Sequence, residues 1–168
     1  GAYGYTSLDD VYKYALDDLR ALEEGKADAV IIENFGDIPY GEHSDLIAYT
    51  SFANIVTRLK EKTSLPIGIN FQFNDYEAEW AIAYACDVDF IRVESFAENR
   101  MGPNGYFKTC GPDLMRLKAR FPKDIALIGD VHVKHTFEVV KQPLDFTIEA
   151  MVEGGIDALI CTGMVTGQ

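Results

Sequence analysis

The sequence has few cysteines, no long apolar run and no nucleotide-binding glycine motif. Its three cysteines, Cys86, Cys110 and Cys161, are odd in number and lack Cys-x-x-Cys spacing, which argues against a disulfide framework and a structural zinc site. The uncharged run 46–57 stops at Arg58 after twelve residues, short of the roughly 18 apolar residues of a membrane span. We therefore expect free thiols, a cytoplasmic location and no transmembrane span.

Positive charge is also scarce. The chain has 15 lysines and arginines against 27 aspartates and glutamates, a formal net charge of −12, which repels the phosphates of nucleic acids. Neither G-x-G-x-x-G nor G-x-x-x-x-G-K-[ST] occurs, so neither a dinucleotide site nor a P-loop is expected. The remaining composition, 48% hydrophobic and 25% charged, is typical of a folded globular domain rather than a disordered chain.

Five helix-then-strand units run along the chain. Apolar residues at helical spacing alternate with short β-branched runs that begin near positions 29, 66, 89, 125 and 157. These spacings match the length of a right-handed crossover unit of roughly 30 residues. The sequence therefore predicts a parallel sheet.

Two architectures use such units, a flavodoxin-like open sheet of five strands and a closed TIM-type (β/α) barrel of typically about 250 residues. Length favours the open sheet. Polar residues at the strand ends favour the barrel, because its mouth gives them a shared wet pocket, whereas helices would bury them on both faces of an open sheet. These residues are Gly68, Asn70, Gln72 and Asn74; Arg92 and Glu94; and Asp130, His132 and Lys134. We expect a single barrel domain over residues 1–168, with the flavodoxin-like sheet as the alternative.

Several motifs stand in a fixed order along the chain. They are ENFGD at 33–37, GIN at 68–70 with Asn74, FIRV at 90–93, DVHVKH at 130–135 and Thr162-Gly163. In this order they resemble the photosystem I biogenesis protein BtpA family, which looks like a ribulose-phosphate-binding type of (β/α) barrel. The resemblance implies one strand before Gly1 and two after Gln168, so that the chain holds about units one to six. It also implies that the phosphate-binding loops after strands seven and eight are absent and that open edges are covered in a homo-oligomer.

The strongest chemical signal is Asp130-x-His132-x-Lys134. Period-two spacing puts the three side chains on one side of a strand, where Asp130 is the candidate base or metal ligand, His132 the proton shuttle and Lys134 the electrophilic stabiliser. Glu33 is a further candidate base, with Asn34 as its orienting donor. The structural alternative is a buried, salt-bridged cluster that orders the barrel.

Other strand ends and loops supply candidate ligand-binding groups. Arg92 suits a phosphate or carboxylate, although pairing with Glu94 in a structural bridge is the alternative we favour slightly. Glu94, Asp130 and His132 together could hold zinc or manganese. Residues 98–111 form a long segment that could be a lid or a surface excursion. The residues assigned to ligand binding are Asn34, Asp37, Asn70, Asn74, Arg92, Glu94, Thr162 and Gly163.

Two functions remain open from the sequence. The first is an enzyme, such as a lyase, isomerase or hydrolase, that acts by acid-base chemistry on a small phosphorylated sugar or nucleoside-type ligand. The second, implied by the family name, is a non-catalytic assembly factor for a membrane complex of the photosystem I type, associated peripherally with the membrane.

Overall fold

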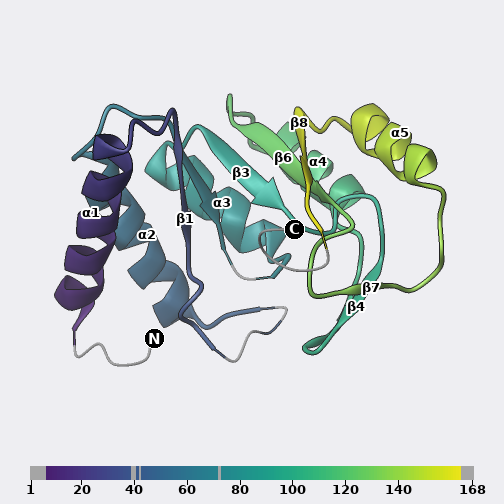
Figure 1. The fold of residues 1–168 in the computed structure, drawn as a ribbon, viewed down its shortest axis with the longest axis horizontal. Helices are drawn as coiled ribbons and strands as arrows, with labels where there is room; N and C mark the ends of the chain where they lie inside the picture. The colour runs from purple at the N-terminus through teal and green to yellow at the C-terminus, as the bar shows by residue number, and fades with distance from the viewer. Residues whose placement is uncertain (1–6, 39–40, 42, 72, 164–168) are drawn as a thin grey trace.

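A five-stranded parallel sheet forms the centre of the protein in the computed structural model, which describes residues 7–38, 41, 43–71 and 73–163 (Figure 1). The strands lie across the sheet in chain order, namely β1 (Val30–Glu33), β2 (Ile67–Asn70), β3 (Phe90–Val93), β6 (Ala126–Val131) and β8 (Ala158–Cys161). Each begins one residue after the position at which the sequence placed it. The predicted alternation and the parallel sheet are therefore confirmed.

Helix α1 (Leu8–Glu24) precedes β1, and four helices connect successive central strands: α2 (Leu46–Lys60), α3 (Tyr76–Cys86), α4 (Gly111–Arg120) and α5 (Leu144–Gly154). Side-chain caps explain where the first three begin. Ser7 Oγ accepts a hydrogen bond from the Asp10 amide at 3.1 Å, and Asp45 caps α2 in the same way. The cap of α3 is Asp75 rather than Asn74, which has a left-handed backbone at φ 68°. Among the helices of the described ranges, none has the length and apolar character needed to cross a membrane.

All five helices cover the same face of the sheet. Consecutive strands are neighbours and consecutive helices pack against each other, as repeated right-handed crossovers in one direction require. Ile69, Ile91 and Leu127, which are aligned across β2, β3 and β6, are fully buried beneath these helices. The opposite face carries the alternate side chains of each strand, including Arg92 and Asp130.

The strand order bears on both expected architectures. A flavodoxin-like sheet has the order 2-1-3-4-5, whereas this open sheet has the sequential order found in (β/α) barrels. The described residues do not close into a barrel, because β1 and β8 each pair with one neighbour in this part of the chain. The closed barrel is therefore not confirmed.

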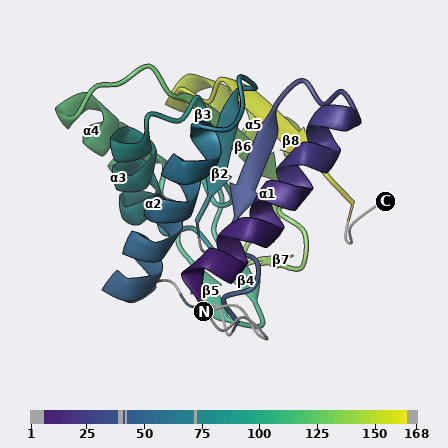
Figure 2. The same cartoon turned by 90° about the vertical axis from the view of Figure 1, so that its left-hand side faces the viewer.

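A second, smaller sheet lies beyond the carboxyl ends of β3 and β6 (Figure 2). It is antiparallel, with the order β5 (Gly105–Phe107), β4 (Arg100–Gly102) and β7 (Phe137–Glu138). Residues 98–111 are therefore mostly a β-hairpin and not the loop that the sequence suggested, while a role as a lid stays a prediction. Phe107 anchors the hairpin, because its ring is buried and lies 4.1 Å from that of Phe73.

Candidate functional site

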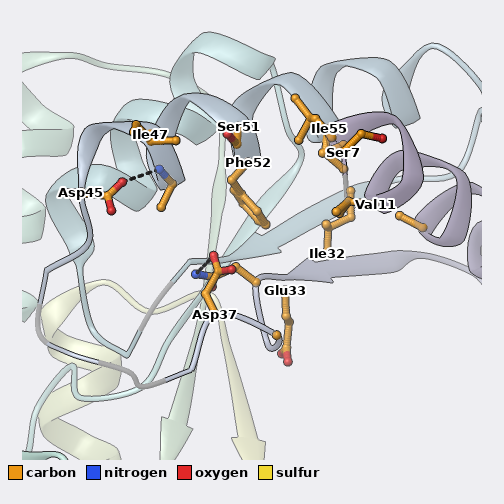
Figure 3. A pocket seen from close by; sticks show the side chains of 15 residues that line it. Ser7, Val11, Ile32, Glu33, Asp37, Asp45, Ile47, Ser51, Phe52 and Ile55 are labelled. Atoms are coloured by element: carbon orange, nitrogen blue, oxygen red, sulfur yellow. Dashed lines mark hydrogen bonds between the residues drawn. The ribbon is translucent and has the colours of Figure 1, made fainter. Parts of the chain in front are cut away.

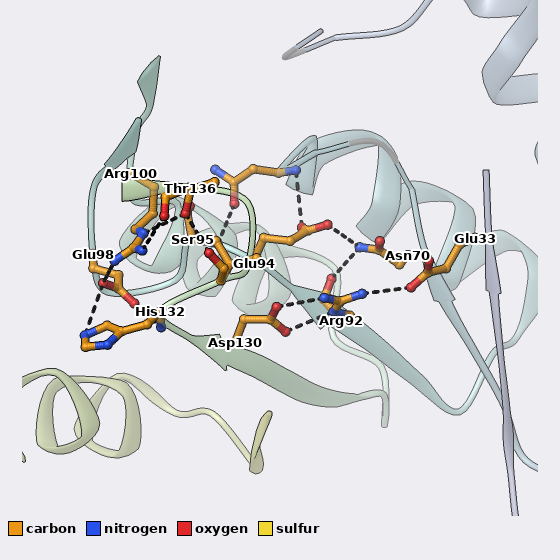
Figure 4. A network of polar contacts seen from close by, with 12 residues as sticks. Glu33, Asn70, Arg92, Glu94, Ser95, Glu98, Arg100, Asp130, His132 and Thr136 are labelled. Atoms are coloured by element: carbon orange, nitrogen blue, oxygen red, sulfur yellow. Dashed lines mark hydrogen bonds and ion pairs between the residues drawn. The ribbon is translucent and has the colours of Figure 1, made fainter. Parts of the chain in front are cut away.

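The carboxyl ends of the central strands bring an arginine between two carboxyl groups (Figure 4). Arg92 donates from Nε and Nη2 to the two carboxylate oxygens of Asp130, at 2.9 and 2.8 Å. Its Nη1 atom donates to Glu33 at 2.8 Å. The three side chains come from β3, β6 and β1, so this trio links strands that are far apart in the sequence.

The trio leaves Arg92 fully engaged. The Asp130 side chain has no exposed surface and that of Arg92 is 13% exposed, so water contributes little to their solvation. The hydrogen bonds and negative charge of Asp130 raise the pKa of Arg92 further above its ordinary value. The sequence-based pairing of Arg92 with Glu94 is wrong, because the hydrogen-bonded partners of Arg92 are Asp130 and Glu33.

Glu94 follows β3 and is buried beside this trio. Asn70 Nδ2 donates to its Oε1 atom at 2.7 Å, and the backbone amide of Asn74 donates to its Oε2 atom at 3.3 Å. Burial raises the pKa of Glu94 to about 7, although the hydrogen bond from Asn70 and the charge of Arg92 act in the opposite direction. A carboxyl group with this pKa exchanges a proton readily at neutral pH.

A second buried carboxyl group, Glu79, stands behind Glu94 on helix α3. It is 1% exposed and accepts a hydrogen bond from the Phe71 amide at 3.2 Å. Desolvation, and then the charge of Glu94, raise the pKa of Glu79 well above its ordinary value. Glu79 was not among the residues predicted from the sequence, although it precedes the buried Ile82 and Cys86 by three and seven residues and so shares their helical face.

Asn74 fixes the segments around Glu94 instead of capping a helix. Its Oδ1 atom accepts from the Ser95 amide at 3.1 Å, and its Nδ2 atom donates to the Lys108 carbonyl at 2.9 Å. The Cys110 thiol, whose pKa burial raises, lies 3.4 Å from the same Oδ1 atom. These contacts join the end of β2 to the segments on either side of the hairpin.

The structure does not bring Asp130, His132 and Lys134 together on one strand face. Strand β6 ends at Val131, and His132 has a left-handed backbone at φ 53°, which breaks the period-two alternation. The His132 amide donates to Glu98 at 2.6 Å, and its Nε2 atom lies 3.1 Å from Glu138. The predicted placement of the three side chains on one strand face is therefore wrong, and Asp130 pairs with Arg92 of the neighbouring strand.

The metal-ligand set expected from the sequence is also not assembled. Within the described ranges, the histidine and carboxylate atoms that gather within 4.8 Å of one another belong to Glu98, His132 and Glu138. Neither Glu94 nor Asp130 is part of this group. The sequence analysis did not select Glu98 and Glu138, because their proximity depends on the small antiparallel sheet.

The ENFGD motif borders a separate cavity of about 570 Å³ (Figure 3). The start of α1, the end of β1 and the first turns of α2 surround it, with Asn34 and Asp37 on its polar side. Asn34 Nδ2 lies 3.4 Å from Asp37 Oδ2. Glu33 borders the cavity and also pairs with Arg92, so it links the cavity to the trio of Arg92, Asp130 and Glu33. Thr162 and Gly163 follow β8 at the same edge of the central sheet, whereas Gln72 lies outside the described residues.

Known proteins match most or all of this chain. Residues 1–168 match the model of the BtpA family. An uncharacterized protein of Methanocaldococcus jannaschii is 37% identical over 100% of this chain and 64% of its own length, and one of Pyrococcus abyssi is 36% identical over 100% of this chain and 65% of its own. The photosystem I biogenesis protein BtpA of Synechocystis is 30% identical over 96% of this chain and 57% of its own length. The chain thus spans just under two thirds of the two archaeal relatives and over half of the cyanobacterial one. This chain belongs to the BtpA family.

Proposed function

We propose that this chain forms the larger part of a (β/α) barrel enzyme that transfers protons on a small hydroxylated ligand, with Glu94 as the group that gives or takes the proton. The observation that carries the proposal is a buried carboxyl group with a pKa of about 7 at the carboxyl end of a central strand. Enzymes tune carboxyl groups to this range by burial, and (β/α) barrels keep their chemistry at this edge of the sheet. The sequential strand order supports the barrel, whose further strands would lie outside residues 1–168.

Neighbouring groups have different roles in this proposal. Asp130 and Glu33 hold Arg92 between them, and ligand hydroxyl groups bind to the carboxylate of Glu33, whose side chain is 31% exposed. Asn70 positions Glu94 through its 2.7 Å hydrogen bond. Glu79, buried behind Glu94, keeps a second proton-binding group within electrostatic range. Lyases and isomerases that act on sugars or nucleosides need such a proton carrier beside hydroxyl-binding groups.

The charge of the site limits where a phosphate group could bind. The trio has two carboxyl groups for one guanidinium, and each N–H-bearing nitrogen of that guanidinium donates to a carboxylate. A phosphorylated ligand would therefore place its hydroxylated end at the trio and its phosphate further away. Phosphosugars remain candidate ligands on this condition.

A ligand screen tests the proposal. Thermal shift measurements with sugars, sugar phosphates and nucleosides identify a compound that stabilises the protein, and its conversion is then followed by NMR. We expect Glu94→Gln to retain the fold and to abolish conversion. Glu77→Gln, on the exposed first turn of the same helix as Glu79, is the matched control and should keep full conversion. Conversion at the wild-type rate by Glu94→Gln would refute the role of Glu94.

A second candidate function comes from the name of the Synechocystis relative, a photosystem I biogenesis protein. Under this proposal the chain acts without turnover on a membrane complex and associates with the membrane peripherally. The exposed apolar side chains Leu46 and Ile47 at the start of α2 are available for such contacts. In a cyanobacterium that lacks its own BtpA protein, restoration of photosystem I by both the wild type and Glu94→Gln would favour this candidate over the enzyme. Restoration by the wild type alone would favour the enzyme.

A further inference from the structure

We propose that Glu98, His132 and Glu138 form a binding site for a divalent transition-metal ion. Glu98 precedes β4, His132 follows β6 and Glu138 belongs to β7. The pairing of Arg100 with Glu138 across β4 and β7 brings the second glutamate beside the first. The left-handed turn at His132 places its imidazole near both carboxylates, and Figure 4 shows it beside that of Glu98.

The distances suit an ion between the three side chains. His132 Nε2 lies 3.1 Å from Glu138 Oε1 and 3.9 Å from Glu98 Oε2, and the three ligand atoms all lie within 4.8 Å of one another. Ligands held at about 2.0–2.2 Å from a tetrahedral ion are separated by roughly 3.3–3.6 Å. Small side-chain movements therefore suffice to place all three atoms around one ion.

The His132 Nε2 atom provides an independent observation that points to a ligand. The atom itself is buried and makes no hydrogen bond, although the imidazole is 36% exposed and two carboxylates lie near the atom. Its approach to Glu138 has a suitable distance but not the alignment of a hydrogen bond. Buried polar atoms in proteins nearly always have a partner, and a metal ion between the imidazole and the carboxylates would supply one.

The surroundings of Glu98 hold it in place for this role. Its Oε1 atom accepts from the His132 amide at 2.6 Å, and its Oε2 atom accepts from Arg100 at 2.8 Å. Arg100 is itself buried, and it donates hydrogen bonds to the side-chain hydroxyl and to the backbone carbonyl of Thr136. Hydrogen bonds of this kind orient metal ligands. The positive charge of Arg100 opposes the ion, so the site retains only part of the attraction of its two carboxylates.

The ligand atoms indicate which ions fit. One imidazole nitrogen and two carboxylate oxygens, with no thiolate, suit Mn²⁺ or Zn²⁺. None of the three ligands belongs to the Glu94 network, so this inference does not depend on the proposed acid-base function. An ion here would place positive charge near a sheet edge that is rich in carboxyl groups.

Metal titration of the whole chain tests the inference. Isothermal titration calorimetry with Mn²⁺ and with Zn²⁺, after treatment with a chelator, should show one saturable site per chain. We expect Glu138→Gln and His132→Gln each to weaken binding at least tenfold. Glu153→Gln, an exposed glutamate on α5, is the matched control and should bind as the wild type does.

The two variants guard against a trivial loss of structure. Circular dichroism identifies a variant that fails to fold, and Glu138→Gln alters a half-buried side chain that caps no helix and lies in the short strand β7. In Mn²⁺ electron paramagnetic resonance, the wild-type signal of bound ion should disappear in Glu138→Gln but not in Glu153→Gln. Absence of a saturable site for both ions, or equal affinity in the folded Glu138→Gln variant, would overturn the proposal and leave an ion pair between His132 and Glu138.

Discussion

Two side chains only two positions apart, Arg92 and Glu94, have opposite electrostatic surroundings. Arg92 is compensated by two carboxylates from other strands. Glu94 is surrounded by hydrogen-bond donors and by a second buried carboxyl group, and desolvation dominates its proton affinity. The difference arises from side chains of other strands and of helix α3, and not from β3 itself.

The pKa of Glu94 makes a prediction about stability and pH. A pKa of about 7 in the fold against an ordinary 4.5 means that the folded protein binds the proton more tightly than the unfolded chain does. Glu94 therefore contributes about 3 kcal/mol to the free energy of unfolding. This contribution is fully present below pH 4.5 and is lost as the pH rises through 7. Urea denaturation at several pH values should show this slope in the wild type and a flatter one in Glu94→Gln. An unchanged slope in Glu94→Gln would contradict the assignment, and exposed Glu77→Gln serves as the control.

Removal of Arg92 should destabilise the protein. Arg92→Met leaves Asp130 without its cation at a position with no exposed surface, which should cost about 3–5 kcal/mol. The loss of positive charge should also raise the pKa of Glu94, because Arg92 now lowers it. Denaturation gives the first quantity and carbon-detected NMR titration of Glu94 the second. Arg92→Lys, which keeps the charge, should leave the pKa of Glu94 nearer its wild-type value; a fall of that pKa in Arg92→Met would contradict the argument.

At the scale of elements, local patterns predicted the helices and strands but not their side-chain partners. The β-branched runs located every central strand to within one residue, because fully buried parallel strands read as short apolar runs. The turn at His132 was not predictable, since its left-handed backbone depends on a hydrogen bond to Glu98, 34 positions away. The pairing of Arg92 with Asp130 spans 38 positions and follows from strand order, which a single sequence does not specify.

Strand β2 depends on a close contact between Gly68 and Phe90, which are register partners on β2 and β3. A Cβ atom at position 68 would lie 2.0 Å from the Phe90 ring, so Gly68→Ala forces the ring to move. We expect a loss of about 1–3 kcal/mol, as for other overpacked sites. Urea denaturation of Gly68→Ala, Phe90→Ala and the double variant checks this cause. Gly68→Ala should cost much less when Phe90 is already alanine, and strictly additive effects would show that the contact is not responsible.

At the scale of the whole molecule, the two faces of the central sheet differ in what covers them and in the side chains they carry. Five helices bury one face, while the other combines the polar trio at the carboxyl ends with apolar side chains nearer the amino ends. Relatives of the chain are longer, which gives them further residues with which to cover this face. Sequential strand order, one helix-covered face and a polar carboxyl edge are the features that support the proposed (β/α) barrel.

Residues 1–168 should self-associate through the uncovered face and the outer strands of the sheet. Ile31 is 38% exposed in the middle of β1, and β1 and β8 each have one paired edge among the described strands. Unpaired strand edges beside apolar side chains favour pairing with a second copy. Sedimentation equilibrium should therefore show dimers or larger species, and Ile31→Lys should shift them toward monomer because the lysine charge would be buried in the contact. Val152→Lys, which adds the same charge to the outer helix α5, should leave the distribution unchanged, and a wild type that is monomeric across the concentration range would refute the prediction.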